Sequence, residues 1–380
     1  MSTAARDKET ADIALIISTL GAGGAQRVLT NLANTWTRQG RRICVITLAG
    51  GDRSFYALDP AVRHLVAGGL GESRNLLKAV SANLRRIRGL RRALRESGAP
   101  LVVSFVGTTN VLTILACRGM KRRVVISERS DPARESLGKA WNFLRRITYR
   151  FADRITANSH GALDTLAHFV PRAKLAYVPN LLTLPETSGK AIPLQNLILA
   201  VGSLRPDKGH DILLYALAKV RDEFPEWKLA LVGEGPWRAH LENLARRLGI
   251  ADPVIFYGQR EDVFSFYSTA RIFVLPSRRE GMPNALLEAM CCGLPCVVSD
   301  ASPGPLEYIV PEQTGLVVPV EDHLALADAL RRLMADEALR LQLGQKARER
   351  VEEFTPARAL PVWEDVLGLK PVNALAGRMS

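Results

Sequence analysis

Short apolar segments alternate with helical patterns along the second half of this 380-residue chain, and this alternation limits the folds open to it. Strands are predicted at 197–202, 228–232, 254–257, 272–275 and 295–298, and helices at 208–223, 237–248, 262–269 and 284–292. Successive strands that are joined through a helix run parallel in one sheet. The first half begins in the same way, with a strand at 12–18, a glycine turn, a helix at 25–39 and a strand at 43–48. The pattern therefore predicts an α/β protein with Rossmann-like parallel sheets.

The length of the chain indicates two domains, because a single hydrophobic core rarely grows to this size. Apolar residues make up 47% of the sequence, which is enough to bury two cores. The stretch 171–196 contains four prolines and little helical periodicity, as a connection between domains does. We predict an N-terminal domain over 1–182, a linker over 183–195, a C-terminal domain over 196–354 and a C-terminal segment over 355–380.

Charge is unevenly distributed between the two halves. Residues 1–190 contain 30 Lys and Arg against 13 Asp and Glu, whereas residues 191–380 carry a small net negative charge. A strongly basic half indicates an anionic partner. The N-terminus has no signal-peptide pattern, and the five cysteines show no disulfide framework, so we expect a protein of the reducing cytoplasm. We interpret the cysteines at 291, 292 and 296 as buried thiols rather than metal ligands, because no histidine is close to them in sequence.

Two glutamates frame the most informative motif, E-G-M-P-N-A-L-L-E. Glu280 follows the strand at 272–275, and Glu288 lies just over one turn into the helix at 284–292. The start of that helix offers free N–H groups and a positive dipole end, which suit a phosphate. Two acids on either side of a phosphate site match a sugar nucleotide, with its sugar, diphosphate and ribose. The alternative is that both glutamates are ordinary solvated acids.

The wider segment, S-R-R-E-G-M-P-N-A-L-L-E-A-M-x-x-G-L-P-x-V, resembles the signature of the retaining glycosyltransferase family 4, in which seven residues separate the two glutamates. Three further segments resemble family motifs and occur in the family order. They are Gly21–Arg27, the N-terminal glycine loop; Val201–Gly209, a phosphate-binding segment; and Leu231–Pro236, the next strand and turn. The resemblance extends over roughly residues 12 to 330.

The resemblance implies the GT-B fold, in which two Rossmann-like domains with parallel sheets face each other across a central cleft and the last helix, here 363–369, crosses back to the first domain. It implies a catalytic group of Glu280 on the donor sugar with Lys208 on the leaving diphosphate. The family often has an arginine where this chain has Ser203, and we infer that Arg205, two residues later, supplies the guanidinium to the diphosphate instead. Lys208 would otherwise be a cation at a helix N-terminus, where the dipole disfavours it, so an anion is expected beside it. The remaining donor-binding residues implied by the resemblance are Gly23, Gly24, Ser203, Gly258, Arg260, Gly281, Met282, Pro283, Asn284 and Glu288, the last on the ribose.

The glycine loop leaves other interpretations open. Gly21, Gly23 and Gly24 open a helix after a strand, but Gln26 stands where a dinucleotide fingerprint has glycine. Asp52 would be the ribose-binding acid of a nicotinamide enzyme. A tight turn without a ligand is a further alternative. We expect no cofactor, because a nucleotide-sugar is a substrate, and no metal, because the chain contains no D-x-D triplet.

The family often has a histidine after the fourth strand of the first domain, and this chain has none there. Thr109 or Asn110 would replace it, or His160, although a histidine at a helix start is more often a solvated or capping residue. Arg129 follows another strand and would bind the diphosphate of an acceptor. A structural pair between Glu128 and Arg129 is the alternative.

A cationic amphipathic helix is predicted between residues 75 and 95, with one leucine-rich stripe and one basic stripe. The basic stripe comprises Lys78, Arg85, Arg88, Arg92 and Arg95, and a second cluster comprises Arg145, Arg146, Arg150 and Arg154. Such a helix can bind an anionic membrane surface; the alternative is the solvated face of a helix packed on the core. Nucleic acid is not expected, because aromatic residues are not interleaved with the basic ones.

These observations predict a cytoplasmic, peripheral-membrane hexosyltransferase that acts with retention and without metal. The donor would be a nucleotide-sugar, UDP-linked rather than GDP-linked, and the acceptor a lipid-linked or growing saccharide in the assembly of cell-surface polysaccharide or glycan. The first alternative is a GT-B epimerase or hydrolase of sugar nucleotides. The second is a non-enzymatic protein that binds anionic lipid or nucleic acid.

Overall fold

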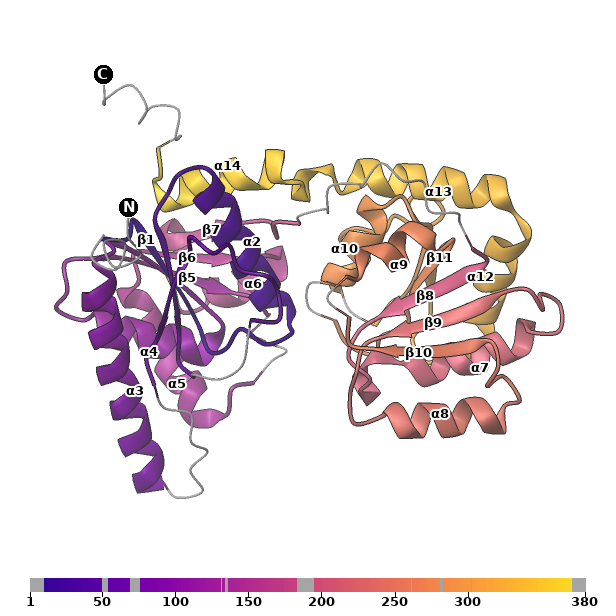
Figure 1. The fold of residues 1–380 in the computed structure, drawn as a ribbon, viewed down its shortest axis with the longest axis horizontal. Helices are drawn as coiled ribbons and strands as arrows, with labels where there is room; N and C mark the ends of the chain where they lie inside the picture. The colour runs from indigo at the N-terminus through magenta and orange to yellow at the C-terminus, as the bar shows by residue number, and fades with distance from the viewer. Residues whose placement is uncertain are drawn as a thin grey trace. The chain divides into compact units, whose positions relative to one another are not determined.

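The computed structural model describes residues 10–49, 54–68, 76–130, 132–133, 136–182, 195–260, 262–280, 283–301 and 303–370, and for residues 76–79, 303 and 353 it describes the backbone only. The described chain forms two compact units. The N-terminal unit is discontinuous in sequence: it comprises the chain up to Leu181 and the chain from Pro356 onward. The C-terminal unit comprises Leu182–Thr355. Each unit contains one parallel sheet with helices on both faces (Figure 1). Among the described residues, no helix is both long and apolar enough to span a membrane.

The N-terminal unit is built on seven strands in the order β3-β2-β1-β4-β5-β6-β7, all parallel. The strands are β1 (Ile13–Ile17), β2 (Ile43–Thr47), β3 (Arg63–Val66), β4 (Leu101–Phe105), β5 (Arg123–Glu128), β6 (Arg154–Ala157) and β7 (Leu175–Tyr177). The helices are α2 (Gly24–Arg38), α3 (Leu76–Ser97), α4 (Gly107–Cys117), α5 (Lys139–Thr148), α6 (His160–Ala167) and α14 (Pro356–Leu367), with short 3-10 turns η1 (Tyr149–Phe151) and η2 (Arg172–Lys174).

Alternate residues of each strand supply two separate cores. In β1, Ile13, Leu15 and Ile17 face α2 and α14, whereas Ala14 and Ile16 face the side covered by α3, α4 and α6. A strand buried on both faces is apolar throughout, which explains the continuous apolar runs in the sequence. The chain end belongs to the first of these cores, because α14 buries Trp363 there and its indole N–H donates to the carbonyl of Pro179 at 2.9 Å. This helix begins earlier than the predicted 363–369.

The C-terminal unit repeats the plan with six parallel strands in the order β10-β9-β8-β11-β12-β13. The strands are β8 (Leu197–Val201), β9 (Lys228–Val232), β10 (Val254–Gly258), β11 (Ile272–Leu275), β12 (Cys296–Ser299) and β13 (Leu316–Val318). The helices are α7 (His210–Val220), α8 (Arg238–Arg247), α9 (Phe264–Thr269), α10 (Asn284–Cys291), α11 (Pro303–Leu306), α12 (His323–Ala335) and α13 (Glu337–Arg350), with 3-10 turns η3 (Pro206–Lys208) and η4 (Glu352–Phe354). Helices α7, α8 and α12 pack on one face, and α9 and α10 on the other (Figure 1).

The sequence-predicted fold class is confirmed. In both sheets the order in which successive strands are added reverses in the middle. This reversal falls between β1 and β4 in the first unit and between β8 and β11 in the second. At such a switch point the loops that follow two neighbouring strands diverge to opposite faces, and ligands of α/β sheets bind in the space they leave. The switch point of the C-terminal unit is therefore where a ligand site is expected, and the predicted motifs at 201–209 and 276–284 both follow its two strands.

Candidate active site

The carboxylate of Glu280 and the ammonium of Lys208 meet at this switch point. Lys208 Nζ donates to Glu280 Oε1 at 2.7 Å, and Ser277 Oγ donates to the same oxygen at 2.7 Å. Lys208 comes from the loop after β8, and Glu280 from the loop after β11. The side chains are 21% and 9% exposed, respectively, so neither is an ordinary solvated charge. The carboxylate of Glu280 is therefore an anion beside Lys208.

Glycine at position 209 allows the two loops to come this close. The turn η3 ends at Gly209, whose φ of 66° lies in the left-handed region. A Cβ at this position would lie 2.0 Å from the carbonyl oxygen of Pro276, at the end of β11. Because backbone cannot yield to such a contact, only glycine fits here. The K-G pair of the sequence motif thus places the lysine and brings its loop against the loop that carries Glu280.

Two further glycines allow the loop after β9 to pack against the loop after β8. A Cβ on Gly233 would lie 1.8 Å from the carbonyl oxygen of Gly202, and one on Gly235 would lie 2.4 Å from that of Leu204. The amide of Leu204 donates to the carbonyl of Glu234 at 3.0 Å. The G-E-G segment therefore supports the backbone that leads to Lys208.

His210 follows Lys208 by two residues, is buried, and was not singled out in the sequence analysis. It is the first residue of α7 and is 3% exposed. Burial, and then the charge of Lys208, lowers the pKa of His210 to about 4. A neutral imidazole at working pH adds no second positive charge beneath the lysine.

Glu288 is buried inside α10 rather than solvated. It is 2% exposed, and its Oε2 accepts a hydrogen bond from Tyr267 Oη at 3.1 Å. Helix α10 begins at Asn284, with Pro283 as the residue before it. Because proline has no N–H, it contributes shape only. Gly281 and Met282 lie outside the described residues.

The other predicted donor-binding residues lie at the same edge of the sheet. Arg205 is about half exposed, and its guanidinium is 3.0 Å from Oδ2 of Asp207. Ser203 is half-buried in the loop after β8. Gly258 ends β10 with a φ of 68°, and Arg260 follows it, exposed, with Nε donating to the carbonyl of Tyr257 at 3.1 Å. None of these contacts joins Arg205 to Glu280 directly, so the charged centre of the site is the Lys208–Glu280 pair.

The sequence also missed Arg278, two residues before Glu280. Its guanidinium donates to both carboxylate oxygens of Asp211 at 2.8 Å, and it also pairs with Glu321. These hydrogen bonds, with Asp211 first, raise the pKa of Arg278 above its ordinary value. Arg278 is part of the S-R-R-E segment that carries the family resemblance, but its partners, Asp211 and Glu321, lie far from it in the sequence.

In the N-terminal unit the glycine loop forms the start of α2. Gly23 precedes the helix, and a Cβ there would lie 2.3 Å from Oε1 of Gln26. The side chain of Gln26 therefore lies over Gly23 and fills the position that a dinucleotide fingerprint leaves empty. Gly24 is the first residue of the helix. Asp52, the acid of the nicotinamide interpretation, lies outside the described residues.

Two of the three residues proposed to replace a histidine are buried in the core, and the third is exposed. Thr109 and Asn110 are fully buried in α4, so neither side chain reaches a ligand at the surface of the unit. The amide of Asn110 donates to the carbonyl of Ser127 at 3.1 Å and to Tyr149 Oη at 3.4 Å. His160 is exposed at the start of α6, where its ring stacks on Tyr177 with centroids 4.9 Å apart.

Arg129 and Glu128 follow β5. Arg129 is half-buried and donates to Asn180 Oδ1, which leaves it near the carboxyl edge of the sheet. Glu128 is 1% exposed; it accepts from Tyr149 Oη and lies 3.9 Å from Nη1 of Arg145. From the sequence, Arg145 was assigned to a cluster of surface cations. The structure corrects this, because Arg145 is buried in α5 beside Glu128.

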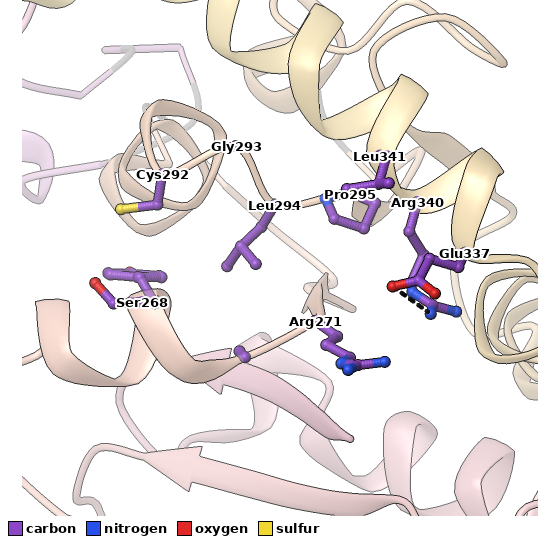
Figure 2. Close-up of a pocket in the computed structure, with 11 residues that line it drawn as sticks. Ser268, Arg271, Cys292, Gly293, Leu294, Pro295, Glu337, Arg340 and Leu341 are labelled. Carbon is purple, nitrogen blue, oxygen red and sulfur yellow. Dashed lines mark ion pairs between the residues drawn. The ribbon is translucent and has the colours of Figure 1, made fainter. Parts of the chain in front are cut away.

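A cavity of about 160 Å³ lies at the opposite edge of the C-terminal sheet (Figure 2). Arg271 and Pro295, which line it, come just before β11 and β12. Arg340 pairs with Glu337 in this cavity (Figure 2), and its guanidinium donates to the carbonyl of Met334 at 3.1 Å, near the end of α12. The arginine thus caps a helix, and the described lining includes none of the sequence-predicted site residues. This cavity belongs to the packing of α13 and not to the candidate active site.

Comparisons with known proteins identify the family to which this chain belongs. The model of the Glycosyltransferase Family 4 matches residues 22–184, and that of Glycosyl transferases group 1 matches residues 189–350. A Campylobacter jejuni protein named GalNAc-alpha-(1->4)-GalNAc-alpha-(1->3)-diNAcBac-PP-undecaprenol alpha-1,4-N-acetyl-D-galactosaminyltransferase is 31% identical over 354 residues, with 92% of this chain and 96% of that protein covered. A second C. jejuni protein, an N-acetylgalactosamine-N,N'-diacetylbacillosaminyl-diphospho-undecaprenol 4-alpha-N-acetylgalactosaminyltransferase, is 25% identical over 354 residues, covering 90% and 95%.

The fold is also found among solved structures. Anabaena HepE in complex with UDP and glucose matches with a TM-score of 0.76 and 18% identity, over 96% of this chain and 99% of that one. Two Rossmann-like units of this kind define the GT-B class of transferase. The chain belongs to glycosyltransferase family 4, and it is accordingly a glycosyltransferase.

Changing Glu280 or Glu288 to glutamine is expected to affect different properties, turnover in the first case and nucleotide binding in the second. Glu280→Gln keeps size but loses the charge that meets Lys208, so turnover should fall while nucleoside diphosphate still binds. Glu288→Gln should weaken the nucleotide itself by about 1.5–3 kcal/mol, the scale of a hydrogen bond to a charged group. Calorimetry with the diphosphate and turnover of saturating donor separate the two effects. Loss of diphosphate binding in Glu280→Gln with intact turnover of bound donor would show that the roles are reversed.

Proposed function

We propose that this enzyme transfers a hexose, with retention, from a nucleotide-sugar to a lipid-linked or growing saccharide in the assembly of cell-surface polysaccharide or glycan. The observation that carries the proposal is the Lys208–Glu280 pair at the switch point of the C-terminal sheet. A leaving diphosphate gains negative charge as the sugar bond breaks, and a fixed ammonium stabilises that charge. Glu280 would accept hydrogen bonds from the hydroxyl groups of the donor sugar.

The donor is proposed to be UDP-linked rather than GDP-linked. Solved relatives of the same fold hold UDP or UDP-glucose. In this chain the start of α10 and Glu288 would bind the diphosphate and the ribose, and the loop at Gly258 and Arg260 would lie along the base. Arg205 would reach the diphosphate after leaving Asp207, a solvated partner that holds it only weakly.

The acceptor is proposed to carry a lipid diphosphate. Two C. jejuni relatives are named for saccharides linked to undecaprenol through a diphosphate. In this chain Arg129 lies after β5 near the carboxyl edge of the N-terminal sheet, where an acceptor diphosphate would find a guanidinium. His160 with Tyr177 offers an exposed aromatic face close to the same edge.

A lipid-linked acceptor requires contact with a membrane, and α3 and α5 provide a surface for it. Helix α3 packs Leu90 and Leu94 in the core, but Val80 and Leu84 are 58% and 46% exposed. The exposed cations of this surface are Arg85, Arg88, Arg92 and Arg95 on α3, and Lys139, Arg146 and Arg150 on or just after α5. Phe143, between the cations of α5, is 63% exposed. The C-terminal half of α3 thus packs its leucines on the core and leaves its cations exposed, whereas the N-terminal half would also offer exposed apolar side chains to lipid.

An epimerase or hydrolase is the second candidate function. Such chemistry needs an acid–base pair, commonly a histidine with a carboxylate. In the described part of the donor site, His210 is buried with a pKa of about 4, and the carboxylate of its neighbour Asp211 is occupied by Arg278. This arrangement favours transfer over acid–base chemistry on water.

Binding of nucleoside diphosphates tests the proposal. Isothermal calorimetry and thermal shift with UDP, GDP and their sugar derivatives should show binding, strongest for one base. Lys208→Ala should weaken the diphosphate by ~1–3 kcal/mol, the scale of a lost charged hydrogen bond. Lys219→Ala, an exposed lysine of α7, is the matched control and should bind as the wild type does. Wild-type protein that binds none of these compounds would refute the proposed donor class.

Transfer is expected to proceed in excess EDTA. The positive charge that a divalent metal supplies elsewhere would come here from Lys208, Arg205 and the N–H groups at the start of α10. Initial rates should be measured with the cognate donor before and after chelation. Activity that disappears with EDTA and returns with Mg²⁺ or Mn²⁺ would contradict metal independence.

Membrane binding is expected to depend on α3. Each cation near an anionic bilayer contributes about 1 kcal/mol, and salt screens this within roughly 8–10 Å. Changing Arg85, Arg88, Arg92 and Arg95 to Glu should release the protein from anionic vesicles in a cosedimentation assay and slow transfer to a lipid-linked acceptor more than to a short soluble one. The control changes four exposed cations of the C-terminal unit, Arg246, Arg247, Lys346 and Arg348, to Glu. Wild-type protein that stays in the supernatant at low salt would leave α3 without a membrane role.

A further inference from the structure

Arg278 joins three segments of the C-terminal unit next to the Lys208–Glu280 pair. Its guanidinium donates to Asp211 in the first turn of α7, with both oxygens at 2.8 Å, and to the carbonyl of Pro206 in η3 at 2.6 Å. It also pairs with Glu321, in the loop between β13 and α12, through Nε and through Nη2 at 2.9 Å. All three nitrogens of the guanidinium are therefore engaged.

The backbone adds to this connection. The amide N–H of Arg278 donates to the carbonyl of Asp207 at 2.8 Å. Arg278 thus contacts residues on both sides of Lys208, through Pro206 and Asp207 before it and Asp211 after it. Since Glu280 follows two residues later, the arginine connects the loop that carries the lysine to the loop that carries the glutamate.

Glu321 meets Arg278 from an unusual backbone conformation. Its φ of 66° is left-handed, which is uncommon and unfavourable for a residue other than glycine. From this loop its carboxylate accepts two hydrogen bonds from the guanidinium. A planar guanidinium suits this double bidentate arrangement, whereas an ammonium on a flexible chain does not.

We propose that Arg278 is a positioning residue for sugar-nucleotide transfer, which fixes the loop of Lys208 against the loop of Glu280 and does not itself bind the donor. This inference rests on the proposed function. Two carboxylates offset the charge of Arg278, and its donors are occupied by protein groups, so it is a poor ligand for a diphosphate. Its effect on the donor passes through Lys208, because the segment on either side of that lysine is what the guanidinium holds.

A double-mutant cycle measured with UDP and GDP, using whichever binds more tightly, tests the inference. The four proteins are the wild type, Arg278→Gln, Lys208→Ala and the double variant. Arg278→Gln should weaken the nucleotide and lower kcat/KM by about tenfold or more, since small misplacements of a binding group have effects of this size. The double variant should bind no more weakly than Lys208→Ala alone, because an arginine that acts through Lys208 has nothing to position once the lysine is absent.

Two control variants separate positioning from a general loss of stability. Arg331→Gln removes another arginine of the same unit with two hydrogen bonds to one carboxylate, those to Glu223 at 2.8 Å. Arg279→Gln removes the exposed neighbour in the same loop. Both should bind nucleotide as the wild type does. Arg278→Lys keeps the charge but not the planar fork, and it should resemble Arg278→Gln.

If Arg278→Gln does not fold, as judged by thermal unfolding, Glu321→Gln replaces it in the cycle because it leaves the Asp211 contacts in place. Effects of Arg278→Gln and Lys208→Ala that add in full would overturn the inference, as would restored affinity in Arg278→Lys, which would indicate a role through charge. Nucleotide affinity in Arg278→Gln equal to that of Arg331→Gln would overturn it too. Wild-type protein that binds neither nucleotide refutes the proposed function, a result distinct from any of these.

Discussion

The ion pair between Lys208 and Glu280 is the interaction around which the C-terminal unit is organised. It joins two residues 72 positions apart in the sequence, and it exists because β8 and β11 are neighbours at the switch point of the sheet. Both side chains are largely removed from water, and a buried charge without a partner would be costly. Each therefore compensates the charge of the other. A ligand that offers an anion to Lys208 and hydroxyl groups to Glu280 can replace both halves of this interaction at once, which a simple anion cannot do.

The pair depends on close backbone packing that only glycine permits. Gly209 lets η3 approach the end of β11, and Gly233 lets the loop after β9 approach Gly202. These contacts set the distance between the loops, while the hydrogen bonds of Arg278 to Asp211 and Glu321 fix the position of one loop relative to the other. The charged centre is thus held by the backbone on one side and by a satisfied guanidinium on the other. Such a site loses little free energy to reorganisation when charge develops in the transition state.

The fold was predictable from the sequence because hydrophobic periodicity and glycine turns are local signals. The strands at 197–202 and 272–275 and the helix at 284–292 correspond to β8, β11 and α10. The motif residues Lys208 and Glu280 were also found, although nothing in the sequence alone showed that they pair with each other. The partners of Glu288, Arg278 and Arg145 were not predictable, since Tyr267, Asp211 and Glu128 come from other segments of the chain. Side-chain contacts between distant segments follow from packing, and packing leaves no periodic trace in the sequence.

The turn after β4 lacks the histidine that the family resemblance led us to expect, and its backbone is strained. Val106, a β-branched residue, has a φ of 75° there, a conformation that such side chains strongly disfavour. Asn110 stabilises this conformation. Its backbone N–H donates to the carbonyl of Val106 at 2.9 Å, and its side-chain amide donates to the carbonyl of Ser127 in β5. Backbone strain of this kind persists only where surrounding contacts fix it, and it is concentrated at functional sites. Leu137, in the loop before α5, packs against the start of α4, because a Cβ on Gly107 would lie 2.6 Å from Cδ1 of that leucine. The turn after β4 is therefore fixed both by its own helix and by the loop that follows β5.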